Sequence, residues 1–269
     1  MVQLASVLKF DDVAARRLET IYSTPDVVGQ RRWTRESLAL QPGEAALDLG
    51  SGPGFLAAEM AAEVGPSGRI SGIDISETMV AMAQEHCSAA GLDGRVDFQL
   101  GDVTELPFPD ESFDAAVSTQ VYEYVSDLDD AIAEVRRVLK PGGRLIVVDT
   151  DWDSLVWHGA DSVLSARVFK AWEEHLVHPH LPRSLTARLE RKGLTMRAHD
   201  AYTLLNPTFD ENTFSYGLIG LIKSFVPGRH GITAHEAEAW AEELRHAGET
   251  GGYFFSLNRY LFVAVKPAA

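Results

Sequence analysis

The sequence is poor in cysteine and contains no long apolar run. Cys87 is the single cysteine among 269 residues, so an internal disulfide is excluded and a reducing compartment is favoured. We expect Cys87 to be a buried small hydrophobe within a helix over residues 78–90. No segment reaches the ~18 apolar residues of a membrane span, and residues 1–10 are not followed by a signal-peptide core. These absences predict a cytoplasmic protein.

Positive charge is also scarce. The chain has 24 Lys and Arg residues against 39 Asp and Glu, which gives a formal net charge of −15. The arginine pairs at positions 16–17, 31–32 and 136–137 do not form a stripe. A phosphate backbone or an anionic bilayer would therefore be repelled. The composition predicts a partner that is neither nucleic acid nor membrane.

Glycine is concentrated where a predicted strand turns into a predicted helix. The apolar segment 44–49 is followed by Gly50, Gly52 and Gly54, and an alanine-rich helical stretch begins at Phe55. Such a turn brings bare backbone N–H groups close to a ligand. Asp74 ends the next apolar segment, at the distance along the chain where an acid accepts hydrogen bonds from a ribose. The pattern predicts binding of an adenosine-containing small molecule.

The glycine spacing differs from that of a dinucleotide site. A dinucleotide fingerprint reads G-x-G-x-x-G, and its third glycine would fall on Phe55. The glycines here read G-x-G-x-G, with Asp48 two residues before the first. A nicotinamide-dependent oxidoreductase stays a rival interpretation, but both features argue against it.

Two further segments carry a family resemblance. Residues 101–114 combine Gly-Asp-Val with Leu-Pro-Phe-Pro-Asp and Ser-Phe-Asp, and residues 135–148 combine a helix end, Lys-Pro-Gly-Gly and an apolar strand. With the glycine segment, they resemble the class I S-adenosylmethionine-dependent methyltransferases. The similarity is to the subgroup of quinone-biosynthesis and natural-product small-molecule methyltransferases, and it covers roughly residues 43–150. An Asn/Asp-Pro-Pro-aromatic run typical of DNA-base enzymes is replaced by residues 119–122.

This resemblance implies S-adenosyl-L-methionine as cofactor and S-adenosyl-L-homocysteine as product. Gly50 and Gly52 would back the methionine moiety, and Asp74 would take the ribose hydroxyls. The other implied contacts are Ile75 packing on the adenine, Asp102 accepting from its amino group beside Val103, Thr119 near the sulfonium, and Tyr22 closing over the methionine part. The loop pattern is that of the metal-free subgroup, so no metal is expected.

The predicted fold is α/β. Five strand–helix alternations over residues 43–150 predict a doubly wound, Rossmann-like parallel sheet. A sixth strand is expected over residues 195–205 and a final strand over residues 253–265. In the resembled family this final strand runs antiparallel, which implies a seven-stranded, mostly parallel sheet.

The domain prediction adds helices to this core. Residues 1–40 are expected to form an N-terminal helical cap, residues 41–209 and 248–269 the core, and residues 210–247 a helical lid inserted between the last two strands. The second inserted helix begins with a capping box formed by Thr233 and Glu236. The apolar first inserted helix suits a lid, a buried helix or a dimer interface equally, so the oligomeric state stays open.

Catalytic candidates follow the fifth strand, where ligands of open α/β sheets bind. The segment 149–158 combines carboxylates with tryptophans. We predict Asp149, Asp151 and His158 as catalytic residues, and the further candidates are Asp153, Tyr122 and Glu123. Methyl transfer requires alignment, exclusion of water and removal of an acceptor proton. The acceptor is expected to be a small molecule with an N, O or C nucleophile. A binding protein that keeps the cofactor but lacks turnover stays a second rival.

Overall fold

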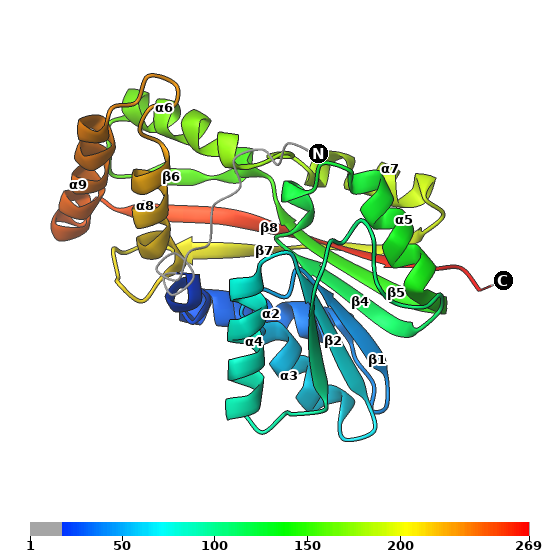
Figure 1. Ribbon diagram of the computed structural model, residues 1–269. Coiled ribbons are helices and arrows are strands. Elements are labelled where there is room, and N and C mark those ends of the chain that lie inside the picture. Colours follow the sequence, from blue (N-terminus) through cyan, green and yellow to red (C-terminus); the bar gives the residue numbers. More distant parts are fainter. Residues whose placement is uncertain (1–17, 269) are drawn as a thin grey trace.

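The computed structural model describes residues 18–268, which form one mixed sheet with helices on both faces (Figure 1). In these residues the sheet has eight strands, in the order β3-β2-β1-β4-β5-β8-β6, with β7 also paired to β8. The strands are β1 Ala45–Leu49, β2 Arg69–Asp74, β3 Val96–Leu100, β4 Phe113–Thr119, β5 Leu139–Thr150, β6 Val156–His158, β7 Thr195–Asn206 and β8 Phe254–Val265.

The first five strands are parallel and β8 runs antiparallel to its three neighbours. The doubly wound α/β fold with an antiparallel final strand is therefore confirmed. The helices are α2 Pro25–Leu38, α3 Phe55–Val64, α4 Glu77–Ala89, α5 Leu128–Val138, α6 Ser162–Trp172, α7 Pro182–Arg191, α8 Phe214–Phe225 and α9 Ala234–Thr250.

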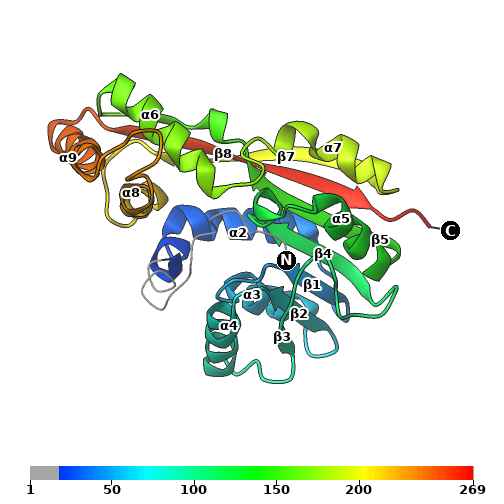
Figure 2. The same cartoon turned by 45° about the horizontal axis from the view of Figure 1, so that its top comes forward.

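Two apolar layers hold these helices on the sheet. Residues of α2, α3 and α4 pack on one face around Met60 and Val117, and residues of α5 and α7 pack on the other around Ile132 and Val147 (Figure 2). The periodicity of α5 explains its orientation, because every residue of its apolar stripe is buried. The carboxyl ends of the parallel strands are left uncovered by these layers, which is where the candidate site lies.

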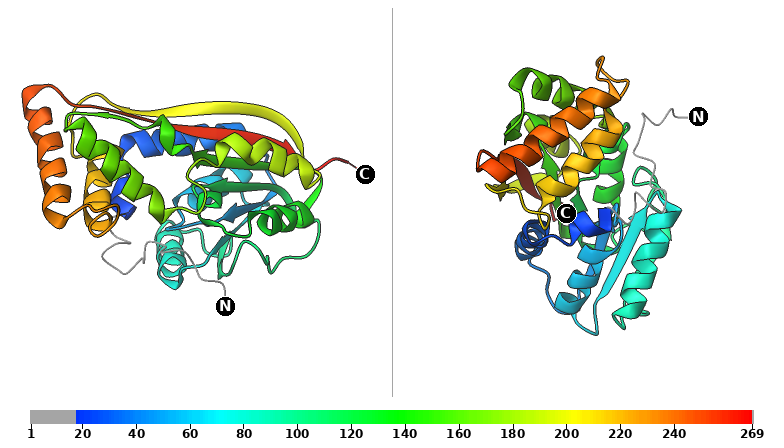
Figure 3. Two further views of the ribbon diagram at one scale, coloured as in Figure 1. Left: turned by 90° about the horizontal axis from the view of Figure 1, so that it is seen from above. Right: turned by 90° about the vertical axis from the view of Figure 1, so that its left-hand side faces the viewer.

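A third apolar cluster lies beyond this core. The strands β7 and β8 extend past β5 and meet α6, α8 and α9 (Figures 1 and 3). The Trp157 ring is buried there and makes edge contacts with Trp240 and Phe255. Trp172 is buried in the same cluster. The two helices predicted between the last two strands are present as α8 and α9. Their function as a lid stays a proposal, as do the domain boundaries.

Some local predictions differ from the structure. The predicted sheet has seven strands, and the eighth strand within residues 18–268 is the three-residue β6, which forms only by pairing with the extended end of β8. The helix α6 ends at Trp172 and continues as the 3₁₀ turn η3, Glu173–His175. Residues 1–17 of the predicted N-terminal cap lie outside the described residues. Residues 18–22 are helical and a break at Ser23 and Thr24 precedes α2.

Two composition-based expectations can be compared with the structure. Cys87 is buried on α4, at 3% exposure, as expected of a small hydrophobe. Over residues 18–268, none of the helices has the length and apolar character needed to cross a bilayer.

The capping box at the start of α9 gives the first prediction. The Thr233 hydroxyl accepts a hydrogen bond from the Glu236 N–H, and the Glu236 carboxylate accepts one from the Thr233 N–H. Replacing Thr233 by Ala should lower the free energy of unfolding by about 1 kcal/mol, since an orphan N–H loses its acceptor. Urea unfolding measures the change. Thr233→Ser keeps the hydroxyl and should stay close to wild type, so equal losses in both variants would contradict the assignment.

Candidate active site

The glycine turn after β1 packs directly against the segment after β4. Gly50 and Gly52 adopt φ of 65° and 51°, in the left-handed region that disfavours side chains. A Cβ on Gly50 would lie 2.3 Å from the Cγ2 atom of Val121. No side chain can therefore be accommodated at Gly50, and bare backbone faces the open edge of the sheet.

Asp74, the last residue of β2, holds this turn in place. Its Oδ2 atom accepts a hydrogen bond from the Gly52 N–H at 2.8 Å, and its Oδ1 atom accepts one from the Ser76 N–H at 2.9 Å. Burial raises the pKa of Asp74, and the two N–H groups oppose that rise. The carboxylate thus joins the turn after β1 to the turn after β2 and is half-buried, with lone pairs available for a ligand.

Other predicted contacts lie along the same edge. Ile75 is 59% exposed next to Asp74, so a large apolar side chain is available for a flat apolar ligand. Asp102 is exposed and its Oδ1 atom accepts hydrogen bonds from the N–H and the hydroxyl of Thr104, while Val103 beside it is buried. Thr119 ends β4, and its buried hydroxyl has no partner among the described residues. The assigned roles of these side chains stay predictions.

A buried carboxyl lies behind the glycine turn. Asp48 is 2% exposed, and its Oδ2 atom has no hydrogen-bond partner within residues 18–268. Burial, together with the nearby charge of Asp74, raises the pKa of Asp48 to about 8. At neutral pH Asp48 is therefore mainly protonated and can donate a hydrogen bond.

A second buried cluster lies at the ends of β4 and β5. It consists of Glu123 in the 3₁₀ turn η1, Tyr122–Tyr124, Asp149 in β5 and Arg259 in β8, with exposures of 1%, 0% and 4%. We call these three residues the buried charge cluster. Burial raises the pKa of Glu123 to about 7 and that of Asp149 well above its ordinary value. The Arg259 guanidinium opposes both shifts.

Hydrogen bonds connect this cluster to the end of β4. Arg259 donates to the Thr150 hydroxyl, which donates to the Gln120 Oε1 atom at 2.8 Å. Gln120 has φ of 58°, which is uncommon for a residue other than glycine and is often found at functional sites. The Trp152 indole N–H donates to the Glu123 Oε2 atom at 3.2 Å.

Tyr22 lies between the two groups of acids. Burial raises the pKa of its hydroxyl, the Arg259 guanidinium opposes that rise, and the charges of Asp74 and Glu123 add to it. The Tyr22 carbonyl accepts a hydrogen bond from the Arg31 guanidinium on α2. The N-terminal segment therefore lies between the glycine turn and the buried charge cluster.

Asp151 lies outside the buried charge cluster, although it is only two residues from Asp149. Its carboxylate accepts hydrogen bonds from Arg183 and from the His180 Nδ1 atom, at 2.6 and 3.0 Å. Burial opposes ionisation, but these bonds outweigh it and lower the pKa of Asp151. Oxygen and nitrogen atoms of Asp151, Asp153 and His180 lie within 4.8 Å of one another, as in a metal site. Arg183 forms ion pairs with both carboxylates, so they already have a cation.

His158 is also separate from Asp149. It is exposed on β6 and pairs with Phe254, whereas Asp149 pairs with Tyr260. These two positions on β8 are six residues, or about 20 Å, apart along an extended strand. Asp149, Asp151 and His158 are predicted together as catalytic residues because they are close in sequence. The structure does not bring their side chains together.

Arg259 is a site residue that sequence reasoning missed. Along β8 the buried positions alternate, and Arg259 occupies an inward position between Leu257 and Leu261. A basic residue at an inward position of an apolar strand is the signal that would have indicated it, because a buried cation needs a carboxylate partner.

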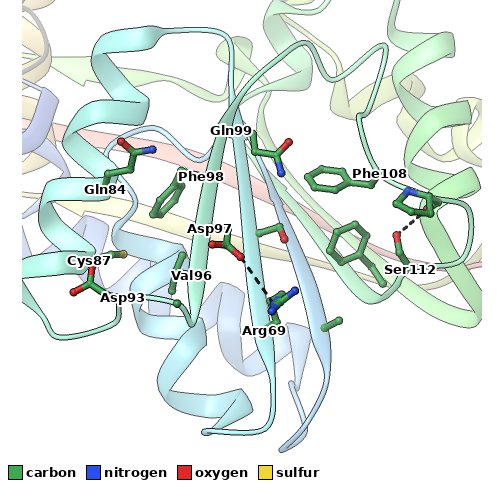
Figure 4. A pocket seen from close by; sticks show the side chains of 15 residues that line it. Arg69, Gln84, Cys87, Asp93, Val96, Asp97, Phe98, Gln99, Phe108 and Ser112 are labelled. Atoms are coloured by element: carbon green, nitrogen blue, oxygen red, sulfur yellow. Dashed lines mark hydrogen bonds and ion pairs between the residues drawn. The ribbon is translucent and has the colours of Figure 1, made fainter.

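A hollow of about 730 Å³ lies along β3, apart from the residues described so far (Figure 4). Arg69 and Asp97 form an ion pair beside it, and Phe98, Phe108 and Ser112 lie around it. None of the predicted cofactor or catalytic residues lines this hollow. We therefore place the candidate site at the carboxyl edge of the sheet and not in this hollow.

The chain is similar to known methyltransferases in sequence. Residues 40–205, more than half of the chain, match the family described as "Methyltransferase domain". The demethylmenaquinone methyltransferase of Symbiobacterium thermophilum is 36% identical over 121 residues, which cover 44% of this chain and 48% of that protein. The matched segments span only 34% to 48% of the length of the first curated relatives.

Solved structures show the same fold. The YcgJ protein of Bacillus subtilis has a TM-score of 0.63 and 23% identity, covering 90% of this chain and 100% of that one. The phosphoethanolamine N-methyltransferase 2 of Haemonchus contortus, solved with S-adenosylhomocysteine, has a TM-score of 0.62 and 18% identity, covering 96% and 58%.

Glu123 gives a prediction about stability and pH. Because burial raises its pKa from 4.5 to about 7, the folded protein binds this proton more tightly than the unfolded chain. The stabilisation is fully present below pH 4.5 and is lost as pH rises through about 7. Glu123→Gln cannot ionise, so its free energy of unfolding relative to wild type should rise between about pH 5 and about pH 8.

Urea unfolding at the two pH values measures this difference. Glu36 on α2 is exposed, so Glu36→Gln serves as the matched control and should show no comparable change. A constant difference between wild type and Glu123→Gln across the range would contradict the buried ionisation.

Proposed function

We propose that this chain, which belongs to the methyltransferase domain family, transfers the methyl group of S-adenosylmethionine to a small molecule. The observation that carries the proposal is the Asp74 carboxylate, which is bonded to the N–H of Gly52 in the glycine turn and is still half-buried at the open edge. An adenosine ribose needs an acid at this position, next to bare backbone. The complex of the Haemonchus relative with S-adenosylhomocysteine supports the same cofactor.

Each residue along this edge would contact a different part of the cofactor. Gly50 and Gly52 would face its methionine part, Asp74 the ribose, and the exposed Ile75 the adenine, with Asp102 and Val103 beyond it. When bound, S-adenosylmethionine supplies a methyl group on a positively charged sulfur. Thr119 and Tyr22 would lie near that sulfur, at the boundary with the buried charge cluster.

The acceptor would bind between the cofactor edge and the third apolar cluster. In-line displacement requires the chain to align the acceptor, exclude water and take up a proton. Among the predicted catalytic residues, Asp149 suits this task best, because it is fully buried beside Glu123. Asp151 would instead position the end of β5 through Arg183, and the exposed His158 would not reach the acceptor.

The remaining proposals concern the context of the reaction. The helices α8 and α9, together with the N-terminal segment, would act as the lid. A single cysteine and an acidic composition favour a cytoplasmic location and partners other than nucleic acid. The oligomeric state is not part of the proposal.

Ligand binding tests the cofactor directly. Calorimetry should show binding of S-adenosylmethionine and S-adenosylhomocysteine, and no binding of nicotinamide dinucleotides, because the glycine turn lacks the third glycine of the dinucleotide fingerprint. Labelled methyl groups should then pass from S-adenosylmethionine into the small-molecule fraction of a cell extract. Preference for a nicotinamide dinucleotide would overturn the proposal, and cofactor binding without any transfer would indicate a binding protein.

Asp74 provides a test of the site itself. Asp74→Ala should weaken S-adenosylhomocysteine binding at least tenfold, or about 1.4 kcal/mol, since hydrogen bonds to the ribose and the anchor of the Gly52 N–H are both lost. Asp97 on β3 is exposed and lies outside the proposed contacts, so Asp97→Ala is the matched control. Wild-type affinity in Asp74→Ala, measured by calorimetry, would remove Asp74 from the site.

A further inference from the structure

The buried charge cluster has two carboxyl groups and only one cation. Glu123, Asp149 and Arg259 are all at least 96% shielded from solvent, given exposures of 1%, 0% and 4%. Among the described residues, Arg259 is the only basic group that affects the ionisation of either acid. One guanidinium can compensate one carboxylate, so the second carboxyl must keep a proton or receive another cation.

The hydrogen bonds of the cluster are also incomplete. Neither carboxyl oxygen of Asp149 has a partner within residues 18–268, and the Glu123 N–H faces Asp149 without reaching hydrogen-bond geometry. The fully buried Tyr122 hydroxyl, whose pKa is raised by burial and by Asp149, has no partner in the same part of the chain. Buried polar groups normally have partners. A donor-rich ligand would complete the cluster.

Three aromatic side chains lie beside Glu123. Trp152 donates its indole N–H to Glu123, and Tyr22 and Tyr124 are close enough to Glu123 for its charge to raise the pKa of each phenol. Both tyrosines keep some exposure, so this side of the cluster is the one nearest to solvent and to the glycine turn. The faces of such rings attract cations, and organic ammonium groups are a common ligand of aromatic walls combined with carboxylates.

We propose that the methyl acceptor is an amine with an apolar body, bound as its ammonium ion between Asp149 and Glu123 against the rings of Tyr22, Tyr124 and Trp152. This inference rests on the proposed methyl transfer and adds the chemical class of the acceptor. An ammonium group supplies the missing positive charge and the N–H donors that the Asp149 oxygens lack. A neutral phenol or alcohol would satisfy the hydrogen bonds but not the charge.

The same carboxyl pair can complete the reaction. One N–H proton of the ammonium moves to a carboxylate oxygen of the pair, and the nitrogen lone pair becomes free. That lone pair forms the bond to the methyl carbon, and the electrons of the carbon–sulfur bond remain on sulfur. The products are a methylated ammonium, a neutral thioether and a protonated carboxyl, so charge and atoms balance. Burial makes the pair a better proton acceptor than an exposed acid.

Titration calorimetry on the full chain with saturating S-adenosylhomocysteine tests the ligand class. The probe is 2-phenylethylammonium, and its neutral and anionic counterparts are 2-phenylethanol and 3-phenylpropionate. The ammonium should bind at least tenfold more tightly than either counterpart. Near neutral pH it should release about one proton, measured by repeating the titration in buffers of different ionisation enthalpy, because the pair ionises when the cation arrives.

Variants identify the groups responsible. The double variant Glu123→Gln, Asp149→Asn should lose both the preference for the ammonium and the proton release, while Asp97→Asn, an exposed acid on β3, should keep both. Tighter or equal binding of the alcohol or the anion, or no ammonium binding at millimolar concentration, overturns the inference. So does a preference that survives in the double variant.

The first titration of the series separates this inference from the proposed function. If S-adenosylhomocysteine binds and the ammonium preference is absent, the acceptor class is wrong and the methyltransferase assignment stands. If S-adenosylhomocysteine does not bind, the proposed function fails, and the ammonium titration in its absence still decides whether the buried charge cluster is a cation site.

Discussion

The carboxyl edge of the sheet, where we propose that the cofactor binds, depends on two hydrogen bonds accepted by the Asp74 carboxylate. One of its oxygens accepts from the turn after β1 and the other from the turn after β2. The glycines of the turn after β1 adopt left-handed φ values, and besides Asp74 the ring of His86 holds the turn through the Pro53 carbonyl oxygen, 2.8 Å from its Nδ1 atom. One acid at the end of one strand therefore helps to arrange the turn for the proposed nucleoside. The parallel pairing of β1 with β2 brings Asp74 level with the start of the glycine turn.

A second constraint acts at the neighbouring strand end, after β4. The segment from Gln120 to Tyr124 touches the glycine turn through Val121 and contributes Glu123 to the buried charge cluster. Tyr22 is electrostatically coupled to acids on both sides. In the proposed function, the cofactor contacts and the buried charge cluster would therefore share residues, and occupancy of one would change the charge environment of the other.

The proposed cofactor contacts rest on local patterns in the sequence to a much greater extent than the proposed acceptor contacts do. Strand ends, glycine spacing and the acids of β2 and β3 are local patterns, and parallel strands bring such ends to one edge. Asp149, Asp151 and His158 are close in sequence, yet Asp151 pairs with Arg183, and His158 follows β6 to the far end of β8. Arg259 is 110 positions after Asp149, and only pairing of β5 with β8 brings them together. The inward position of Arg259 on an apolar strand indicates that it needs a carboxylate partner, but no local pattern indicates which one.

The strand β8 also limits how the molecule can open. Its carboxyl half pairs with β5 and β7 in the core, and its first residues pair with β6 beneath the helical cluster. Bending β8 would break hydrogen bonds on both sides at once, so movement of the proposed lid would have to leave β8 in place. Access to the proposed acceptor site would then come mainly from the side of residues 18–24, which lead into α2 and belong to no strand.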